Sequence, residues 1–341
     1  MRRAVNAQAL VVDCDSGLLV PARILIEELR EDEVLVRITH CGVCRSDLNR
    51  LKTPRSASNS PVVPGHEVVG EVVQLGGRVS GLSVGTRVGI GWQSAACGGC
   101  EWCLQGAQHL CADQEETCIR RYGGFATHIK VQSRFAFQIP QALDSAHAAP
   151  LLCAGITVFS PIVRHALHAG RKTAVVGIGG LGHLALQFLK AMGCTPDAFS
   201  NSPSKAADAH AFGARDFFCL RDKKALPALA STYDFILSTS PGGSDLTGLI
   251  RMLRPQGMLC LVGLPPEETT FAAEELIAFQ KTIEGSPIGP PKLIADMFQF
   301  AADHGVRPKI ECCAMTDANK AMVRLAENQI RYRAVLVQDL E

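Results

Sequence analysis

The chain has 341 residues, more than one ordinary hydrophobic core accommodates, so two domains are expected. Its formal net charge is only +1, from 34 Lys and Arg against 33 Asp and Glu, which gives no electrostatic basis for nucleic acid or an anionic membrane as partner. There is no apolar run of about 18 residues that would predict a transmembrane helix, and Asp13 and Asp15 interrupt the N-terminal stretch too early for a signal-peptide core. The 14 cysteines of so large a chain fit a reducing cytoplasm better than a secreted disulfide scaffold.

The first 150 residues carry short alternating runs separated by glycine turns, which predicts an all-β region. Strands are expected at 33–39, 68–73 and 87–90, and the polar, proline-bounded stretch 51–64 is expected to be a loop. This region looks too irregular to close alone. The C-terminal segment is therefore expected to return and complete it.

A scattered set of metal-binding residue types lies within and just after this region. It comprises Cys44 in CGVCRSDL, His66 and Glu67 in PGHEVVGEV, and Cys153 in LLCAGITVF. Cys and His ligands far apart in the chain, with a Glu nearby, are typical of a catalytic zinc that keeps one open position. Taken singly, His66 and Cys153 are also explained as buried packing residues.

Three neighbours of this set have predicted roles. Ser46 is close enough in sequence to Cys44 to pass a proton to a substrate oxygen held by zinc. Asp47 could fix the tautomer of the His66 imidazole by a hydrogen bond. Glu67 could assist ligand exchange or remain outside the ligand set.

A second cysteine group has the spacing C-x2-C-x2-C-x7-C. It is formed by Cys97, Cys100, Cys103 and Cys111. Four thiolates in one short loop predict a tetrahedral, closed and therefore structural zinc site; the alternative is disulfides or loose surface thiols. The other cysteines are interpreted as packing residues, namely Cys14, Cys41, Cys118, Cys194, Cys219, Cys260, Cys312 and Cys313.

From about Cys153 onward, strand and helix patterns alternate, which predicts a parallel sheet with crossover helices. Strands are expected at 173–176, 197–200, 216–219, 233–238 and 258–262, and helices at 181–192, 204–213 and 245–253. The end of the chain is expected to form helices at 292–304 and 317–328 and a final strand at 334–337. Strand 258–262 could pair edge to edge across a dimer.

The segment that follows the first of these strands has the pattern G-x-G-x-x-G. Its residues are Gly177, Gly179, Gly180, Leu181 and Gly182. Because the pattern follows an apolar strand and opens a helix, it predicts a dinucleotide whose pyrophosphate sits at the helix N-terminus. The alternative is a glycine-rich turn with no ligand.

The end of the second strand indicates which dinucleotide binds. No acid stands there to hold ribose hydroxyls, since Asp197 lies earlier and inside the strand. Ser200, Asn201 and Ser202 can donate hydrogen bonds to a 2′-phosphate, and Lys205 supplies positive charge. This favours NADP(H) over NAD; the alternative is that the segment only caps the next helix and exposes its lysine.

These motifs resemble the zinc-containing medium-chain dehydrogenase/reductase superfamily. Within it, the chain is similar to the cinnamyl alcohol dehydrogenase group and its bacterial aldehyde reductase relatives. The match covers essentially the whole chain and is carried by CGVCRSDL, PGHEVVGEVV, CGGCEWC, LLCAGITVFSP, VVGIGGLGHLALQFLKAMG, LVGLPPE and GSPIG. The resemblance implies an α/β chain with a GroES-like catalytic domain over 1–153, a Rossmann doubly wound parallel-sheet domain over 154–286, and a segment 287–341 that returns to the first domain.

The resemblance also implies roles for individual residues. Cys44, His66 and Cys153 become the catalytic zinc ligands, Glu67 stands beside them, and Cys41 is left as packing. Ser46 becomes the proton relay, and the four cysteines 97, 100, 103 and 111 hold the structural zinc. A bulky apolar substrate pocket for aromatic or medium-chain aldehydes is implied at Trp92, Leu264, Pro287 and Ile288.

Three positions depart from the group's pattern. Arg45 stands where the group usually has His, and in some alcohol dehydrogenases such an arginine meets the cofactor pyrophosphate. Asn49 stands where many members have the His that ends the proton relay. Asn201 replaces one serine of the 2′-phosphate loop.

The expected function is a zinc-dependent alcohol dehydrogenase or aldehyde reductase that transfers hydride between NADP(H) and a small aldehyde or primary alcohol. Two zincs per chain, a cytoplasmic location and a homodimer are expected with it. The alternatives are an NAD-dependent alcohol dehydrogenase of the same fold and a non-enzymatic NADP(H)-binding protein.

Overall fold

The computed structural model describes residues 4–52, 61–222, 226–240, 245–264 and 268–341 of the chain. Most of the expected loop 51–64 and the last three residues of the LVGLPPE motif lie outside these ranges. The chain forms two compact units. The first comprises Met1–Ile156, Pro290–Asp303 and Arg307–Glu341, and the second comprises Thr157–Gly289 and His304–Val306.

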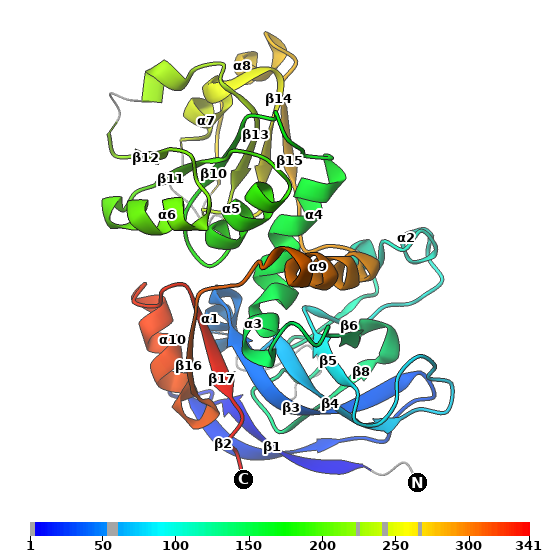
Figure 1. Ribbon diagram of the computed structural model, residues 1–341. Coiled ribbons are helices and arrows are strands. Elements are labelled where there is room, and N and C mark those ends of the chain that lie inside the picture. Colours follow the sequence, from blue (N-terminus) through cyan, green and yellow to red (C-terminus); the bar gives the residue numbers. More distant parts are fainter. Residues whose placement is uncertain (1–3, 53–60, 223–225, 241–244, 265–267) are drawn as a thin grey trace. The chain divides into compact units, whose positions relative to one another are not determined.

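The first unit is built on a seven-stranded sheet (Figure 1). Its strand order is β16 (Ile310–Ala314), β17 (Arg333–Val337), β3 (Glu33–Val43), β4 (Val68–Leu75), β5 (Arg87–Ile90) and β9 (Phe137–Gln138), with β8 (His128–Gln132) also paired to β3. β3, the longest strand, is almost wholly buried because neighbours cover both its edges and α3 (Ser145–Pro150) packs on it. The predicted strands at 33–39, 68–73 and 87–90 are confirmed, with β3 and β4 longer than expected.

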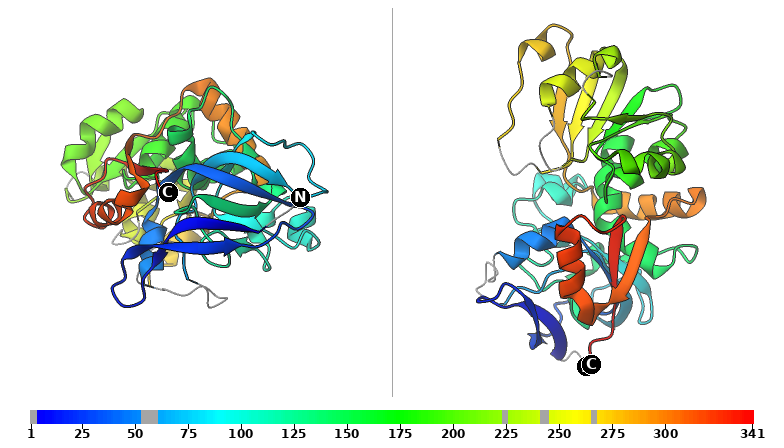
Figure 2. Two further views of the ribbon diagram at one scale, coloured as in Figure 1. Left: turned by 90° about the horizontal axis from the view of Figure 1, so that it is seen from below. Right: turned by 90° about the vertical axis from the view of Figure 1, so that its left-hand side faces the viewer.

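The C-terminal segment completes this sheet, as the sequence predicts. β17 pairs antiparallel with β3 through Ala334 opposite Val43, and β16 runs parallel to β17. Figure 2 shows the red C-terminal segment beside the blue N-terminal strands. The residues around Cys44 and those around Arg333 therefore lie on adjacent strands although they are far apart in the chain.

Smaller elements surround this sheet. The strands β1 (Val5–Val12) and β2 (Leu19–Ile26) form a hairpin, and β6 (Gln93–Ala95) and β7 (Glu115–Glu116) form a second small sheet. The helices of this unit include α1 (Arg45–Leu51), α2 (Glu101–Leu104), α9 (Pro291–His304) and α10 (Ala318–Ala326). The predicted helices at 292–304 and 317–328 are confirmed as α9 and α10. Leu51, expected to begin a loop, is instead the last residue of α1.

One helical stretch is long and apolar enough, by length and composition, to cross a membrane. It runs from Ser145 to Arg164 and includes α3, the π-helical turn Leu151–Gly155 and α4 (Ile156–Arg164). Within it, 78% of the most apolar window is buried inside the structure. Such burial is what the core helix of a globular fold shows.

The second unit contains a six-stranded parallel sheet with helices between its strands (Figure 1). The strand order is β12 (Phe217–Cys219), β11 (Asp197–Ser200), β10 (Thr173–Val176), β13 (Tyr233–Ser238), β14 (Leu253–Leu261) and β15 (Thr282–Gly285), and the helices are α5 (Gly182–Ala191), α6 (Ala206–Phe212), α7 (Leu246–Met252) and α8 (Glu274–Ile277). β10, β11 and β13 are fully buried, as apolar strands of a covered parallel sheet are. The predicted fold class, a GroES-like β unit plus a Rossmann-type parallel sheet, is confirmed.

One prediction about this sheet is wrong. The stretch 258–262 was suggested as a strand that could pair edge to edge across a dimer. β14, which contains most of it, instead lies inside the sheet, hydrogen-bonded to β13 on one side and β15 on the other. β15, which sequence patterning missed, occupies the end of the sheet beyond it.

Candidate active site

Three different elements bring the predicted catalytic residues together. Cys44 is the N-cap of α1, and its backbone N donates to Asp47 Oδ2 at 2.8 Å, which anchors the first helical turn. His66 and Glu67 immediately precede β4. Cys153 lies in the π-helical turn Leu151–Gly155, a local irregularity that is frequent at functional sites.

The donor atoms of Cys44, His66, Glu67 and Cys153 all lie within 4.8 Å of one another. The Sγ atoms of Cys44 and Cys153 are 3.8 Å apart, which is too long for a disulfide and matches the roughly 3.8 Å that two thiolates span when each is about 2.3 Å from a tetrahedral zinc. His66 Nε2 and Glu67 Oε2 are buried and have no hydrogen-bond partner among the residues described. The donor set therefore fits a zinc ion.

Charge at this site favours a cation as well. The hydrogen bond with Cys153 holds the pKa of the Cys44 thiol well below its usual value, and His66 acts in the same direction. A thiol whose pKa is lowered gives up its proton more readily, and the thiolate is the form that binds metal.

Asp47, predicted to fix the tautomer of His66, lies in contact with the imidazole. Its Oδ1 atom is 3.1 Å from His66 Nδ1 and also accepts a hydrogen bond from the backbone N of Gly65. Both side chains are completely buried. A carboxylate at Nδ1 favours the tautomer that carries its proton there, so Nε2 would be the nitrogen that a neutral His66 offers to a metal.

Glu67 is paired with a residue that sequence reasoning missed. Arg333, on β17, forms a buried ion pair with Glu67. The glycine of the CGVC motif, Gly42, makes room for this carboxylate, because a Cβ at Gly42 would collide with Glu67. No local signal could have identified Arg333, since the contact depends on β17 pairing with β3.

Two further side chains contact His66. Trp92 packs edge-on against its ring, with centroids 5.0 Å apart and an interplanar angle of 86°. Cys118, which was interpreted as a packing residue, has its sulfur within 4.8 Å of the donor atoms of Asp47 and His66. That interpretation is therefore incomplete for Cys118, and it is wrong for Cys14 and Cys312, which are exposed.

The remaining predicted residues near Cys44 lie along α1. The Ser46 hydroxyl is 3.8 Å from Cys44 Sγ and is half-buried, so it faces the donor set. Arg45 and Asn49 are exposed, and Arg45 Nη2 donates to Asn328 Oδ1 at 2.7 Å. α1 thus presents its serine to the donor set and its arginine to the surface of the unit.

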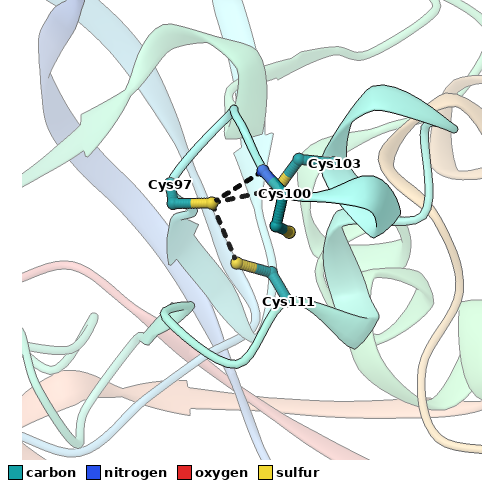
Figure 3. Close-up of side chains that lie close together, drawn as sticks. All are labelled: Cys97, Cys100, Cys103 and Cys111. Carbon is teal, nitrogen blue, oxygen red and sulfur yellow. Dashed lines mark hydrogen bonds between the residues drawn. The ribbon is translucent and has the colours of Figure 1, made fainter.

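The second cysteine group is also brought together. Cys97 Sγ is 3.8 Å from Cys103 Sγ and 3.6 Å from Cys111 Sγ, and Cys100 completes the cluster (Figure 3). Hydrogen bonds from the backbone N–H groups of Gly99 and Cys100 lower the pKa of Cys97 to about 6. These separations suit four thiolates around one tetrahedral zinc, and the cluster lies on the loop containing α2.

The backbone of the glycine loop in the second unit makes use of its glycines. It joins β10 to α5, with Gly177 at φ +90°. A Cβ at Gly182 would collide with Gly177 O, so close strand–helix packing demands glycine there. A Cβ at Gly179 would meet nothing within 4 Å, so this glycine borders open space, where a ligand can approach the backbone.

The end of β11 lies beside this loop. Lys205 Nζ donates to Ile178 O at 2.7 Å, so the lysine side chain reaches the glycine loop instead of projecting into solvent. Ser200 is buried, and its hydroxyl accepts from the backbone N of Ser202 at 3.2 Å. Asn201 is exposed.

Asp197 is engaged elsewhere. It begins β11, at the opposite end of the strand from Ser200. It is completely buried, accepts from Arg215 Nη2 at 2.6 Å and accepts from the Tyr233 hydroxyl at 2.7 Å. This carboxylate is therefore committed to a structural network.

The predicted substrate-pocket residues belong to different units. Trp92 is half-buried in the first unit, against His66. Leu264, Pro287 and Ile288 belong to the second unit, where Leu264 is 84% exposed.

Comparison with known proteins agrees with this architecture. Residues 30–141 match the sequence model of the alcohol dehydrogenase GroES-like domain, and residues 180–303 match that of the zinc-binding dehydrogenases. The chain is 38% identical over 321 residues to an aldehyde reductase, AdhA, of Synechocystis, a match that covers 94% of this chain and 96% of the relative. It is 37% identical to a probable cinnamyl alcohol dehydrogenase of Arabidopsis thaliana, which covers 98% of this chain and 94% of the relative.

Solved structures give the same result. A cinnamyl alcohol dehydrogenase from Sorghum bicolor superposes with a TM-score of 0.94 at 34% identity and covers 99% of both chains. A cinnamyl alcohol dehydrogenase from Helicobacter pylori, solved as a complex with NADP(H), superposes with a TM-score of 0.88 at 28% identity, again over 99% of both chains. The chain therefore belongs to the zinc-containing medium-chain dehydrogenase/reductase superfamily, among the aldehyde reductases and cinnamyl alcohol dehydrogenases, and is an oxidoreductase of alcohols or aldehydes.

Proposed function

We propose that this protein is an NADP(H)-dependent, zinc-dependent alcohol dehydrogenase that acts as an aldehyde reductase. The observation that carries the proposal is the convergence of Cys44, His66 and Cys153, with the two sulfur atoms 3.8 Å apart and a buried Nε2 atom that has no hydrogen-bond partner among the residues described. Three protein ligands of this kind leave one position for a substrate oxygen, as catalytic zinc sites do.

The chain's own residues have distinct roles in this reaction. Cys44, His66 and Cys153 would hold the metal, which when bound supplies Lewis acidity toward a carbonyl oxygen. Asp47 keeps His66 in its orientation through the 3.1 Å contact at Nδ1. Ser46 would pass a proton to the substrate oxygen as hydride reaches the carbonyl carbon. The Arg333 guanidinium pairs with the buried Glu67 carboxyl next to the ligands and balances its charge.

The second cysteine group would hold a structural zinc and take no part in the chemistry. Its ligands would be Cys97, Cys100, Cys103 and Cys111. All four metal positions would be filled by thiolates, so no position remains for a substrate. Two zincs per chain are therefore part of the proposal.

The preference for NADP(H) is supported by three features of the second unit. The glycine loop, formed by Gly177, Gly179, Gly180, Leu181 and Gly182, would bind the pyrophosphate, which NADP(H) shares with NAD(H). Ser200, Asn201 and Ser202 offer hydrogen-bond donors where an acid would repel a 2′-phosphate, and Lys205 brings a cation to the same loop. Asp197, the nearest acid on the strand, is already bound by Arg215 and Tyr233.

The proposed substrates are aromatic or medium-chain aldehydes and the corresponding primary alcohols. Trp92 supports an aromatic partner, because its indole packs against His66 at the donor set. A cytoplasmic location is supported by the 14 cysteines, none of which forms a disulfide in the structure; the homodimer rests on the family resemblance.

The test compares NADPH and NADH as reductants of cinnamaldehyde and benzaldehyde, with the zinc content of the same preparation measured. Faster turnover with NADPH in protein that holds two zincs per chain supports the proposal. Preference for NADH overturns the 2′-phosphate assignment and leaves the enzyme class. Absence of turnover in protein with two zincs overturns the proposed substrate class.

A further inference from the structure

Cys118 has an unusual backbone conformation for its residue type. Its φ angle is +64°, in the left-handed region that favours glycine, and its side chain is 2% exposed. A residue with a Cβ is strained in this conformation, and strained residues of this kind concentrate at binding and catalytic sites. The strain therefore points to a role for the side chain that stands there.

The preceding residue explains how the strain is maintained. The Thr117 hydroxyl donates to Gly91 O at 2.8 Å and lies 2.5 Å from Ser94 Oγ, while its backbone N donates to Trp92 O at 2.8 Å. Thr117 and Ser94 are completely buried. These bonds fix residue 118 to the segment that carries Trp92, with the strands β6 and β7 paired alongside.

The thiol of Cys118 interacts with the ring of His66. Its sulfur, an oxygen of Asp47 and a nitrogen of His66 lie within 4.8 Å of one another, and all three side chains are buried. Three groups thus lie beside the imidazole: the Asp47 carboxylate, the edge-on Trp92 ring and the Cys118 sulfur. Cys118 is the member whose backbone is strained.

We propose that Cys118 is a positioning residue for the candidate zinc ligand His66. Asp47 sets the tautomer through one bond, about which the ring can still tilt. The Cys118 sulfur restricts that tilt, so that Nε2 keeps its direction toward Cys44 and Cys153. The proposal rests on the proposed function, because it requires a metal at that donor set, and partners of this kind commonly change metal affinity by about 10- to 100-fold.

The experiment uses full-length protein and the variants Cys118→Ala, Cys118→Ser and Cys118→Gly. Zinc affinity is measured by competition with a chromophoric chelator, and the catalytic site is followed by the visible d–d absorption of Co²⁺-substituted protein. Cys118→Ala is expected to weaken the more labile of the two zincs by about 10- to 100-fold and to shift the cobalt bands. Cys118→Ser, which keeps a hydrogen-bonding group, is expected to recover part of both.

Two matched controls separate positioning from packing and from strain. Cys194→Ala removes another buried thiol, one that lies in the second unit and donates to His168 O. Ala166→Gly relaxes another residue with positive φ, at +46°. Both are expected to leave zinc affinity and the cobalt spectrum unchanged. Cys118→Gly relaxes the strain but also removes the sulfur, so it is expected to weaken zinc binding and shift the cobalt bands as Cys118→Ala does.

The outcomes are distinct. If the parent protein holds two metals per chain and all three folded Cys118 variants keep its affinity and cobalt bands, the positioning role is wrong and the proposed function stands. If the parent binds only the metal of the four-cysteine cluster, the proposed function is wrong and the positioning role falls with it. Circular dichroism establishes that each variant compared is folded.

Discussion

Arg333 and Glu67 form a buried ion pair beside the candidate zinc ligands, although they are separated by 266 residues in the chain. Arg333 is 4% exposed and Glu67 is completely buried. Burial raises the pKa of the Glu67 carboxyl, and the Arg333 guanidinium counteracts this rise. The C-terminal strand β17 therefore supplies the counter-charge for a carboxylate at the centre of the first unit.

Replacement of Arg333 by Met is expected to destabilise the protein by about 3–5 kcal/mol, because it leaves the buried Glu67 carboxyl without its charged partner. Urea unfolding measures the change in the free energy of unfolding. Arg324→Met, which removes an exposed pair with Glu311 on the same unit, is the control and is expected to cost less than about 1 kcal/mol. Equal effects of the two substitutions would contradict the role given to Arg333.

Cys111→Ser is expected to lower the metal content by one per chain and to lower the midpoint of thermal unfolding. Cys111 lies in one cluster with Cys97, Cys100 and Cys103, and metal bound there would stabilise the folded form. The substitution removes one of the four ligands of this metal. Elemental analysis and calorimetry measure the two effects. Cys14→Ser, at an exposed cysteine, should change neither quantity; retention of full metal content by the Cys111 variant would show that the cluster is not a zinc site.

Asn201→Asp is expected to lower kcat/KM for NADPH by roughly tenfold, about 1.4 kcal/mol, while kcat/KM for NADH stays the same or rises. The introduced carboxylate would repel a 2′-phosphate and could accept from ribose hydroxyls. Because Asn201 is exposed, the substitution should not affect folding. Asn201→Ala controls for loss of the amide, and a parallel fall with both cofactors would contradict the assignment.

Glu33 is expected to make the stability of the first unit depend on pH. Burial raises the pKa of this carboxyl. The Arg30 backbone N–H, Arg121 and Lys130 lower the pKa, and together they outweigh burial, so the pKa of Glu33 is below its usual value. A lowered pKa means that the charged form stabilises the fold above the unfolded pKa and that this contribution is lost as pH falls through the folded value.

Glu33→Gln is therefore expected to cost about 2 kcal/mol at pH 7 and distinctly less near pH 3.5. Urea unfolding of parent and variant at both pH values measures this difference. Glu71→Gln serves as the comparison, since Glu71 is paired with Arg37 on the surface at 2.5 Å. A cost for Glu33→Gln that does not depend on pH would show that its charge is not what stabilises the fold.

The elements of the second unit were predictable because their signals are local. The apolar strand 173–176, the glycine loop and the helix after it follow one another within about 20 residues, and the structure has them as β10, the loop and α5. The order of strands in a sheet is not a local property. That is why 258–262 could be taken for an edge strand, although β15 pairs with β14 beyond it.

The site shows the same division. Cys44, His66 and Cys153 were identified because their surroundings form recognisable motifs, and the four cysteines of the second cluster were identified by spacing. Arg333 was missed because only the pairing of β17 with β3 brings it to Glu67.

Cys118 was missed because its conformation cannot be read from residue type. A left-handed φ favours glycine, so a cysteine in the sequence gives no indication of such a backbone.

The most direct test of the central claim is metal removal. The claim is that zinc held by Cys44, His66 and Cys153 is required for aldehyde reduction. The rate of NADPH-dependent cinnamaldehyde reduction would be measured before treatment with 1,10-phenanthroline, after it, and again after zinc is restored, with metal content determined at each stage. The account predicts that activity falls in proportion to the zinc lost and returns with it. Full activity in protein stripped of both metals would contradict it.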